Sequence, residues 1–233
     1  MNRKIAYDFL VLTPGLQINW NQVEGMSYEQ LGTGNAHCIY DFEGAQKTWK
    51  AMSEFAKKGG RGIYTDTYTK HKCGGAPKKI CLLTEDYSRK QGTRDSLELK
   101  YFSAEKALYD VKFFTPRLLE IYNERNIPIT LNTRLKGIDT AAKQVHFEPI
   151  IKNGDEKTVT TSVEDYDFLH FTPPMSAPDF VKEAGLGFSE GKLADGGWVM
   201  VDKETLVHQK YPNIISLGDV AGLPTSKTSA AAR

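Results

Sequence analysis

The sequence predicts an α/β fold, a doubly wound nucleotide-binding-type domain with an antiparallel β excursion. Between residues 61 and 132, short apolar segments alternate with helical patterns, which is typical of a parallel sheet covered by helices. Residues 137–150 and 158–161 are separated by the turn Asn153-Gly154-Asp155, which predicts an antiparallel pair. The two patterns together predict the fold class.

Two elements are predicted before the alternating region. Residues 5–12 predict a buried strand that ends at the sharp turn Thr13-Pro14-Gly15. Apolar residues then recur at helical spacing from residue 41 to 58, and Gly59-Gly60 stops the helix that they predict. We expect this helix to join two parts of the fold.

The alternating region contains five elements. In order, the spacing predicts a strand at 61–67, a helix at 76–91, a strand at 97–102, a helix at 111–126 and a strand at 127–132. Gly92 closes the first of these helices. Strand and helix in this order form one complete nucleotide-fold unit.

Three further strands are predicted toward the end of the chain, at 166–171, 198–202 and 213–217. The last of them leads directly into Gly218-Asp219. We expect neither this turn nor the first strand to belong to the central nucleotide-fold unit. We therefore expect three portions, residues 1–58, 59–172 and 173–233. The chain is expected to be part of a larger protein.

Composition narrows the class of function. The 30 Lys and Arg residues nearly balance 29 Asp and Glu residues, which excludes the single-sign charge of a nucleic-acid binder. No run of about eighteen apolar residues predicts a membrane span. Cys38, Cys73 and Cys81 are too few and too widely spaced for a disulfide framework or a zinc site. The five histidines show no metal-ligand spacing either, so we expect no metal.

Cys73 lies in the glycine-rich segment Lys72-Cys73-Gly74-Gly75-Ala76-Pro77, between a predicted strand and a predicted helix. In doubly wound folds this position is the ligand crevice. Amide groups at the helix start and the neighbouring lysines favour an anion such as a thiolate, the nucleophilic form of cysteine. The residues alone equally allow a glycine-rich turn with an incidental cysteine. The dinucleotide fingerprint Gly-x-Gly-x-x-Gly is absent from the sequence.

Four separated motifs resemble the sulfide:quinone oxidoreductases, a family of disulfide-oxidoreductase-like flavoproteins. They are KCGGAPKK at 72–79, YDFLHFTPPMSAP at 166–178, GWVMVDKETLVHQKY at 197–211 and GDVAGLPTSKTSAA at 218–231. The last two are similar to the branch that includes the mitochondrial enzymes. The resemblance covers nearly the whole chain and implies a Rossmann-like, FAD/NAD(P)-binding insert flanked by remnants of the FAD domain.

The resemblance also implies an activity. Members oxidise sulfide at a redox cysteine, pass two electrons through FAD to a quinone and form sulfane sulfur as persulfide or polysulfide. Cys73 would be one of two redox cysteines, and its partner is expected beyond Arg233. Cys38 falls where some members carry an additional cysteine for sulfur handling, although a small buried apolar role is equally open. Cys81 is expected to be structural.

The resemblance further implies flavin-binding residues. Thr13, Pro14 and Gly15 resemble the turn at which backbone approaches the dinucleotide. Gly218 and Asp219 resemble the second flavin motif, whose carboxylate accepts hydrogen bonds from the ribityl chain. Lys227 is similar to a lysine near the flavin and the quinone, where a positive charge stabilises the reduced flavin. Without the resemblance, Gly218-Asp219 would indicate only a turn and Lys227 only an exposed lysine.

The expected partners are sulfide, a quinone and a thiol or polysulfide that accepts the sulfur. Contact with the bacterial or mitochondrial inner membrane is expected through segments outside this chain. Lys78 and Lys79 stand where some members carry an acidic residue, so the proton acceptor is unassigned. The alternatives are an NADH:quinone dehydrogenase, against which the missing fingerprint argues, a flavocytochrome sulfide dehydrogenase, and a non-catalytic persulfide-carrying module.

Overall fold

A computed structural model describes residues 4–109, 111–150 and 161–223 of the 233. The chain divides into two compact units. The larger consists of Trp20–Tyr68 and Gly74–Pro174, and the smaller of Met1–Asn19, Thr69–Cys73 and Met175–Arg233. The three portions expected from the sequence stay a prediction. The first boundary between the compact units follows Asn19, whereas the first expected portion ends at residue 58.

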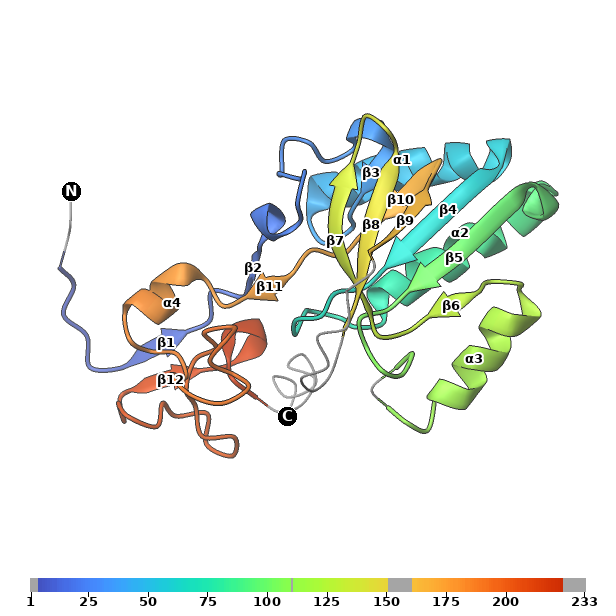
Figure 1. The fold of residues 1–233 in the computed structure, drawn as a ribbon. Coiled ribbons are helices and arrows are strands. Elements are labelled where there is room, and N and C mark those ends of the chain that lie inside the picture. Colours follow the sequence, from blue (N-terminus) through green and yellow to red (C-terminus); the bar gives the residue numbers. More distant parts are fainter. Residues whose placement is uncertain (1–3, 110, 151–160, 224–233) are drawn as a thin grey trace. The chain divides into compact units, whose positions relative to one another are not determined.

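A five-stranded parallel sheet forms the centre of the larger unit (Figure 1). Its strands, from one edge to the other, are β3 (Ala36–His37), β10 (Phe168–His170), β4 (Gly60–Thr65), β5 (Leu97–Phe102) and β6 (Ile129–Thr130). Every neighbouring pair is parallel, so all five carboxyl ends meet at one edge of the sheet. The predicted α/β fold with a parallel sheet is confirmed.

Among the described residues three α-helices accompany this sheet, and two match the predicted bounds to within one residue. In α1 (Phe42–Lys58), the Asp41 carboxylate accepts a hydrogen bond from Gly44 N at 2.8 Å and caps the first turn. This helix lies inside the larger unit, and its expected role in joining two parts of the fold stays a prediction. The second helix, α2, spans Ala76–Gln91 and ends at Gly92, whose φ of 71° suits glycine.

The third helix, α3 (Thr115–Glu124), begins later than the predicted residue 111. Pro116 explains the difference. Proline lacks a backbone N–H and fits the first turn of a helix, where no hydrogen-bond partner for that group exists. The sequence pattern had placed this proline in the helix interior.

The helices and a second sheet cover opposite faces of the parallel sheet. Tyr101 and Phe102 are neighbours on β5, and neighbouring side chains on a strand point to opposite faces. The Tyr101 ring packs edge-on against Tyr122 of α3, with ring centres 5.6 Å apart. The Phe102 ring stacks on Phe147 of β8 at 4.0 Å. The central strands are therefore buried on both sides.

The second sheet is antiparallel and has three strands, β7 (Thr133–Asp139), β8 (Gln144–Pro149) and β9 (Ser162–Asp165). The prediction of one strand over 137–150 is wrong, because the chain reverses between β7 and β8. The Asp139 carboxylate accepts hydrogen bonds from Ala141 N and Ala142 N, and Lys143 adopts a φ of 53°. The predicted turn at 153–155 lies outside the described residues.

In its described residues, the smaller unit contains two short strand pairs and one α-helix. Its elements are β1 (Leu10–Leu12), parallel to β12 (Ile214–Ser216), β2 (Gln17–Ile18), antiparallel to β11 (Met175–Ser176), and α4 (Asp179–Glu183). Its core packs around Val199, Val220 and Trp198. The predicted strand at 198–202 is wrong, since only single bridges at Val199 and Val201 form there.

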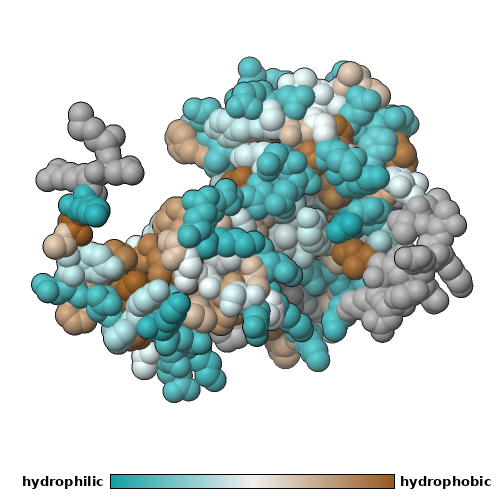
Figure 2. All heavy atoms as spheres, turned by 60° about the vertical axis from the view of Figure 1, so that its left-hand side comes forward, coloured by the Kyte–Doolittle hydropathy of each residue, from teal (hydrophilic) through white to brown (hydrophobic). Residues whose placement is uncertain are grey.

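The first strand is shorter and more exposed than predicted. Ile5 and Phe9 precede β1 with exposed fractions of 75% and 71%, so the predicted buried strand at 5–12 is wrong. Among the described residues β1 pairs only with β12, and one partner cannot cover both edges and faces of a strand. Apolar surface is visible beside the N-terminal segment in Figure 2.

Candidate functional site

Cys73 lies in the loop between β4 and α2 and is exposed. Its φ is 53°, in the left-handed region that residues with a β-carbon rarely adopt. Gly75 caps the following helix and Pro77 lies in its first turn, so the Gly-Gly-Ala-Pro segment starts α2 as the sequence predicts. The predicted redox cysteine therefore has a strained backbone and an accessible thiol.

The loop that leads to Cys73 is bound to the smaller unit. Residues Thr69–Cys73 belong to this unit. Thr69 Oγ1 accepts a hydrogen bond from Met175 N at 2.9 Å, and Lys70 Nζ donates to the Leu223 carbonyl at 3.4 Å. The Thr69 carbonyl also contacts His71 Nδ1 at 3.0 Å. The segment directly before Cys73 is therefore held by hydrogen bonds of Thr69, Lys70 and His71.

The other two cysteines are buried. Cys81 on α2 is 0% exposed, and burial raises the pKa of its thiol far above the ordinary value, so it stays protonated. Cys38 follows β3 and is also 0% exposed, in the larger unit. Its suggested part in sulfur handling stays a prediction, and sulfide could reach it only after the structure opens.

Residues expected to bind flavin lie together in the smaller unit. Thr13-Pro14-Gly15 follows β1, and Gly218-Asp219 follows β12. The two strands are adjacent and parallel, with Leu12 opposite Ser216, so both turns leave the same end of the pair. Ser216 Oγ donates to the Leu12 carbonyl at 2.8 Å and fixes this end.

Both turns leave room for a ligand. Gly15 and Gly218 have φ values of 78° and 77°, and a β-carbon built on either would find no heavy atom within 4 Å. Asp219 is half-buried at the start of the short turn that follows. Open backbone beside a carboxylate suits the hydroxyl groups of a nucleotide cofactor. Lys227 lies outside the described residues.

A buried ion pair in the larger unit, between the end of β4 and the start of α2, was missed by the sequence analysis. Asp66, at the carboxyl end of β4, is 1% exposed, and its Oδ2 accepts a hydrogen bond from Lys78 Nζ at 3.0 Å. Lys78 lies in the first turn of α2 and is 6% exposed. An acidic residue that ends a strand and a lysine that starts the next helix were the available signal.

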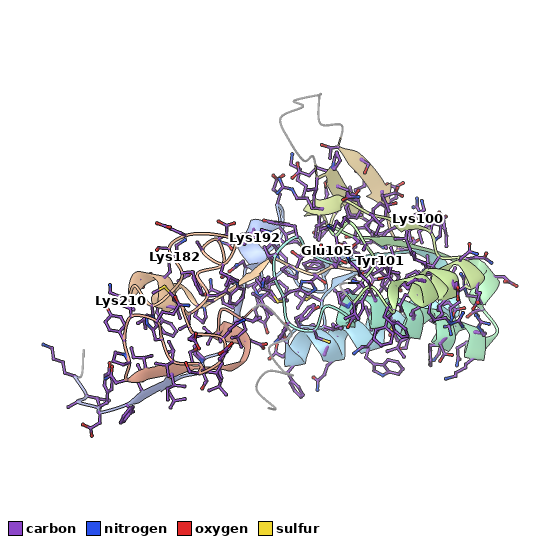
Figure 3. The ribbon with its side chains drawn as sticks, turned by 90° about the horizontal axis from the view of Figure 1, so that it is seen from below. Lys100, Tyr101, Glu105, Lys182, Lys192 and Lys210 are labelled. Carbon is purple, nitrogen blue, oxygen red and sulfur yellow. The ribbon has the colours of Figure 1, made fainter. Side chains whose placement is uncertain are left out.

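A pocket of about 440 Å³ opens at the carboxyl ends of β4, β5 and β6. It is lined by Tyr68, Ala104, Glu105, Lys106, Asn132, Arg134, Pro149 and Ile150. The guanidinium of Arg134 lies 5.1 Å from the centre of the Tyr68 ring. Figure 3 labels Glu105, which comes from the loop after β5.

The described residues contain neither a metal-binding cluster of side chains nor a membrane-spanning helix. No group of three or more His, Cys, Asp or Glu side chains there could hold a metal ion. In the same residues, no helix is both long and apolar enough to cross a bilayer.

Comparison with known proteins gives close relatives but no family model that matches the chain. The chain is 37% identical to the mitochondrial sulfide:quinone oxidoreductase of Mus musculus, over 98% of this chain and 48% of the relative. It is 38% identical to the Dictyostelium discoideum protein of the same name, over 98% of this chain and 47% of the relative. The chain spans about half the length of these curated relatives.

One solved structure confirms the fold. The sulfide:quinone oxidoreductase of the bacterium Aquifex aeolicus superposes with a TM-score of 0.77 at 22% identity, over 95% of this chain and 48% of that one. The resemblance drawn from the four motifs is confirmed by these comparisons, including its reading as a partial chain.

Proposed function

We propose that this chain is part of a sulfide:quinone oxidoreductase, in which Cys73 takes up the sulfur of sulfide and FAD carries two electrons to a quinone. The likeness to proteins of that name over 98% of the chain supports the activity. The observation that carries the assignment of Cys73 is its exposure in a loop of the same compact unit as the predicted flavin-binding turns.

The smaller unit fits FAD. Gly15 and Gly218 leave open space where two adjacent parallel strands end, so backbone amides there are accessible to phosphate or ribityl oxygens. The half-buried Asp219 carboxylate would accept hydrogen bonds from ribityl hydroxyls. Thr13 and Pro14 would line the first turn. When bound, FAD supplies a two-electron acceptor that a quinone can reoxidise.

The sulfur chemistry begins at a disulfide between Cys73 and a second redox cysteine that lies outside this chain. Hydrosulfide attacks one sulfur of that bond, so that one new S–S bond forms, the old one breaks and one cysteine leaves as a thiolate. The sulfur of sulfide is oxidised by two electrons and the disulfide is reduced. A thiol or a polysulfide then accepts the bound sulfur.

Exposure of Cys73 is what this chain contributes to the step. The attacking hydrosulfide must reach a sulfur atom, and exchange rates depend on that access. Of the three cysteines only Cys73 is exposed, while Cys38 and Cys81 are 0% exposed. We therefore assign the reaction to Cys73 and a structural role to Cys81. The location at a bacterial or mitochondrial inner membrane belongs to the same proposal.

The test is anaerobic reduction of the flavin by sulfide in the full-length protein. Wild type and Cys81→Ala should lose the absorbance of oxidised flavin rapidly, and Cys73→Ser should not. Cys81→Ala is the matched control because it also removes one thiol, from a buried position. Loss of the absorbance with NADH but not with sulfide, in every variant, would contradict the proposal and favour an NADH:quinone dehydrogenase.

A further inference from the structure

We propose that Lys78 is a positioning residue for Cys73: its ammonium group ties the carbonyl of Gly74, the residue after Cys73, to the buried Asp66 carboxylate. Only the predicted effect of Lys78 on sulfide oxidation rests on the proposed function. The anchor itself is a property of the fold.

The ammonium group of Lys78 uses all three of its hydrogen atoms. Lys78 Nζ lies 3.0 Å from Asp66 Oδ2, 3.1 Å from the Gly74 carbonyl oxygen and 3.2 Å from the hydroxyl oxygen of Tyr101. A lysine ammonium has three donors and no acceptor, so this set is complete. The Tyr101 ring, labelled in Figure 3, also lies 5.4 Å from Nζ.

The Asp66 carboxylate is equally saturated. Beside Lys78, its Oδ2 accepts hydrogen bonds from Tyr101 OH at 3.2 Å and Ser103 Oγ at 2.8 Å, and its Oδ1 accepts one from Ala104 N at 2.9 Å. The Asp66 side chain is 0% exposed. If Lys78 left this position, a buried carboxylate would lose its counter-charge, which is strongly destabilising. The ammonium group is therefore fixed.

Cys73 needs such a fixed neighbour. Its φ of 53° is unfavourable for a residue with a β-carbon, and conformations of this kind persist only where the surrounding structure holds them. The Gly74 carbonyl is one residue further along the chain, and hydrogen bonding to Lys78 sets the plane of the Gly74–Gly75 peptide. From Gly75 onward α2 continues the constraint, since Lys79 N donates to the Gly75 carbonyl at 2.9 Å.

Without the anchor, we expect Cys73 to relax to an ordinary negative φ. A left-handed residue costs roughly 1–2 kcal/mol, so the native conformer would become a minority population, lower by about tenfold. Reaction of Cys73 with sulfide would slow by a similar factor.

Two variants separate positioning from general stability. Asp66→Asn combined with Lys78→Met removes both charges together, so that no buried charge is left alone, and replacing a buried ion pair in this way is often nearly neutral. Glu85→Gln is the control on the same helix. Glu85 is 0% exposed and pairs with Arg89, Arg94 and Arg125, so its loss loosens α2 away from Cys73.

The deciding measurement is the ¹³Cα and ¹³Cβ chemical shifts of Cys73 in the full-length reduced protein, labelled at cysteine and assigned with Cys73→Ser. These shifts report backbone conformation and need neither sulfide nor quinone. We expect them to move away from the left-handed values in the double variant and to stay as in wild type in Glu85→Gln. Sulfide-dependent flavin reduction should fall about tenfold in the double variant alone.

Unchanged Cys73 shifts in a folded double variant would overturn the inference. If wild type failed to reduce its flavin with sulfide, the proposed function would be wrong, while the chemical shifts would still decide whether Lys78 positions Cys73.

Discussion

Acidification should destabilise the larger unit because two histidines are buried side by side in its sheet. His37 on β3 lies opposite His170 on β10, with exposed fractions of 4% and 0%. Among the described residues, neither ring nitrogen of His170 has a hydrogen-bond partner. Burial, followed by the neighbouring His37, lowers the pKa of His170 to about 3. Burial, followed by Lys47, lowers the pKa of His37 to about 4.

The sign of the effect follows from these lowered pKa values. Above pH 6.5 both histidines are neutral in the folded and the unfolded chain, so the free energy of unfolding is unaffected. Below about pH 6.5 the unfolded chain takes up protons that the folded chain cannot, and stability falls by about 1.4 kcal/mol per pH unit for each histidine. At pH 5 the loss is about 2 kcal/mol per histidine, or about 4 kcal/mol for the pair.

The assay is urea unfolding of the full-length protein at pH 7 and pH 5. In His170→Asn we expect the loss of unfolding free energy between the two pH values to fall from about 4 to about 2 kcal/mol, whatever the variant does to stability at pH 7. His146→Asn, at a partly exposed position of β8, is the control and should keep the wild-type pH dependence. An unchanged loss in His170→Asn would refute the reasoning from burial.

Four further variants test two glycine positions, one core ring and one helix cap. Gly34→Ala should lower the urea midpoint of unfolding strongly, because the new β-carbon would lie 2.1 Å from the Thr140 carbonyl oxygen. Gly92→Ala is the control, because its β-carbon would find no heavy atom within 4 Å, and it should cost only about 1 kcal/mol of unfolding free energy. Equal losses of stability in the two variants would contradict this prediction. Phe147→Ala should destabilise by about 3–5 kcal/mol in urea unfolding, because the 0% exposed ring stacks on β5. Asp41→Ala should cost about 1 kcal/mol through loss of the α1 cap, and an unchanged midpoint would show that the cap contributes nothing.

The sequence pattern predicted those helices and strands whose bounds depend on neighbouring residues in the chain. The bounds of α1 and α2 follow from apolar spacing and from the glycines that end them, and β5 was predicted to the residue. The hairpin between β7 and β8 was missed because its turn contains neither glycine nor proline. The Asp139 side chain and the left-handed Lys143 make that turn, and no short motif signals the combination.

Only those residues of the candidate site that lie in a recognisable local sequence motif could be predicted. Cys73 could be identified because glycines, lysines and a helix start surround it in the sequence. The Asp66–Lys78 pair could not, since a buried charge is recognised only once its partner is known, and the strand-loop-helix connection brings the two together across 12 residues. The open space at Gly15 and Gly218 likewise depends on the pairing of β1 with β12, whose residues are about two hundred positions apart.

The most direct test of the central claim is to locate the sulfur after one exposure to sulfide. The oxidised full-length protein would be treated anaerobically with sulfide, quenched with an alkylating reagent and digested, and the masses of the cysteine peptides would be measured. The account predicts that the peptide with Cys73, or that with its redox partner, gains the mass of one sulfur atom, and that Cys73→Ser abolishes the gain at both. A gain of sulfur that persists in Cys73→Ser would contradict it.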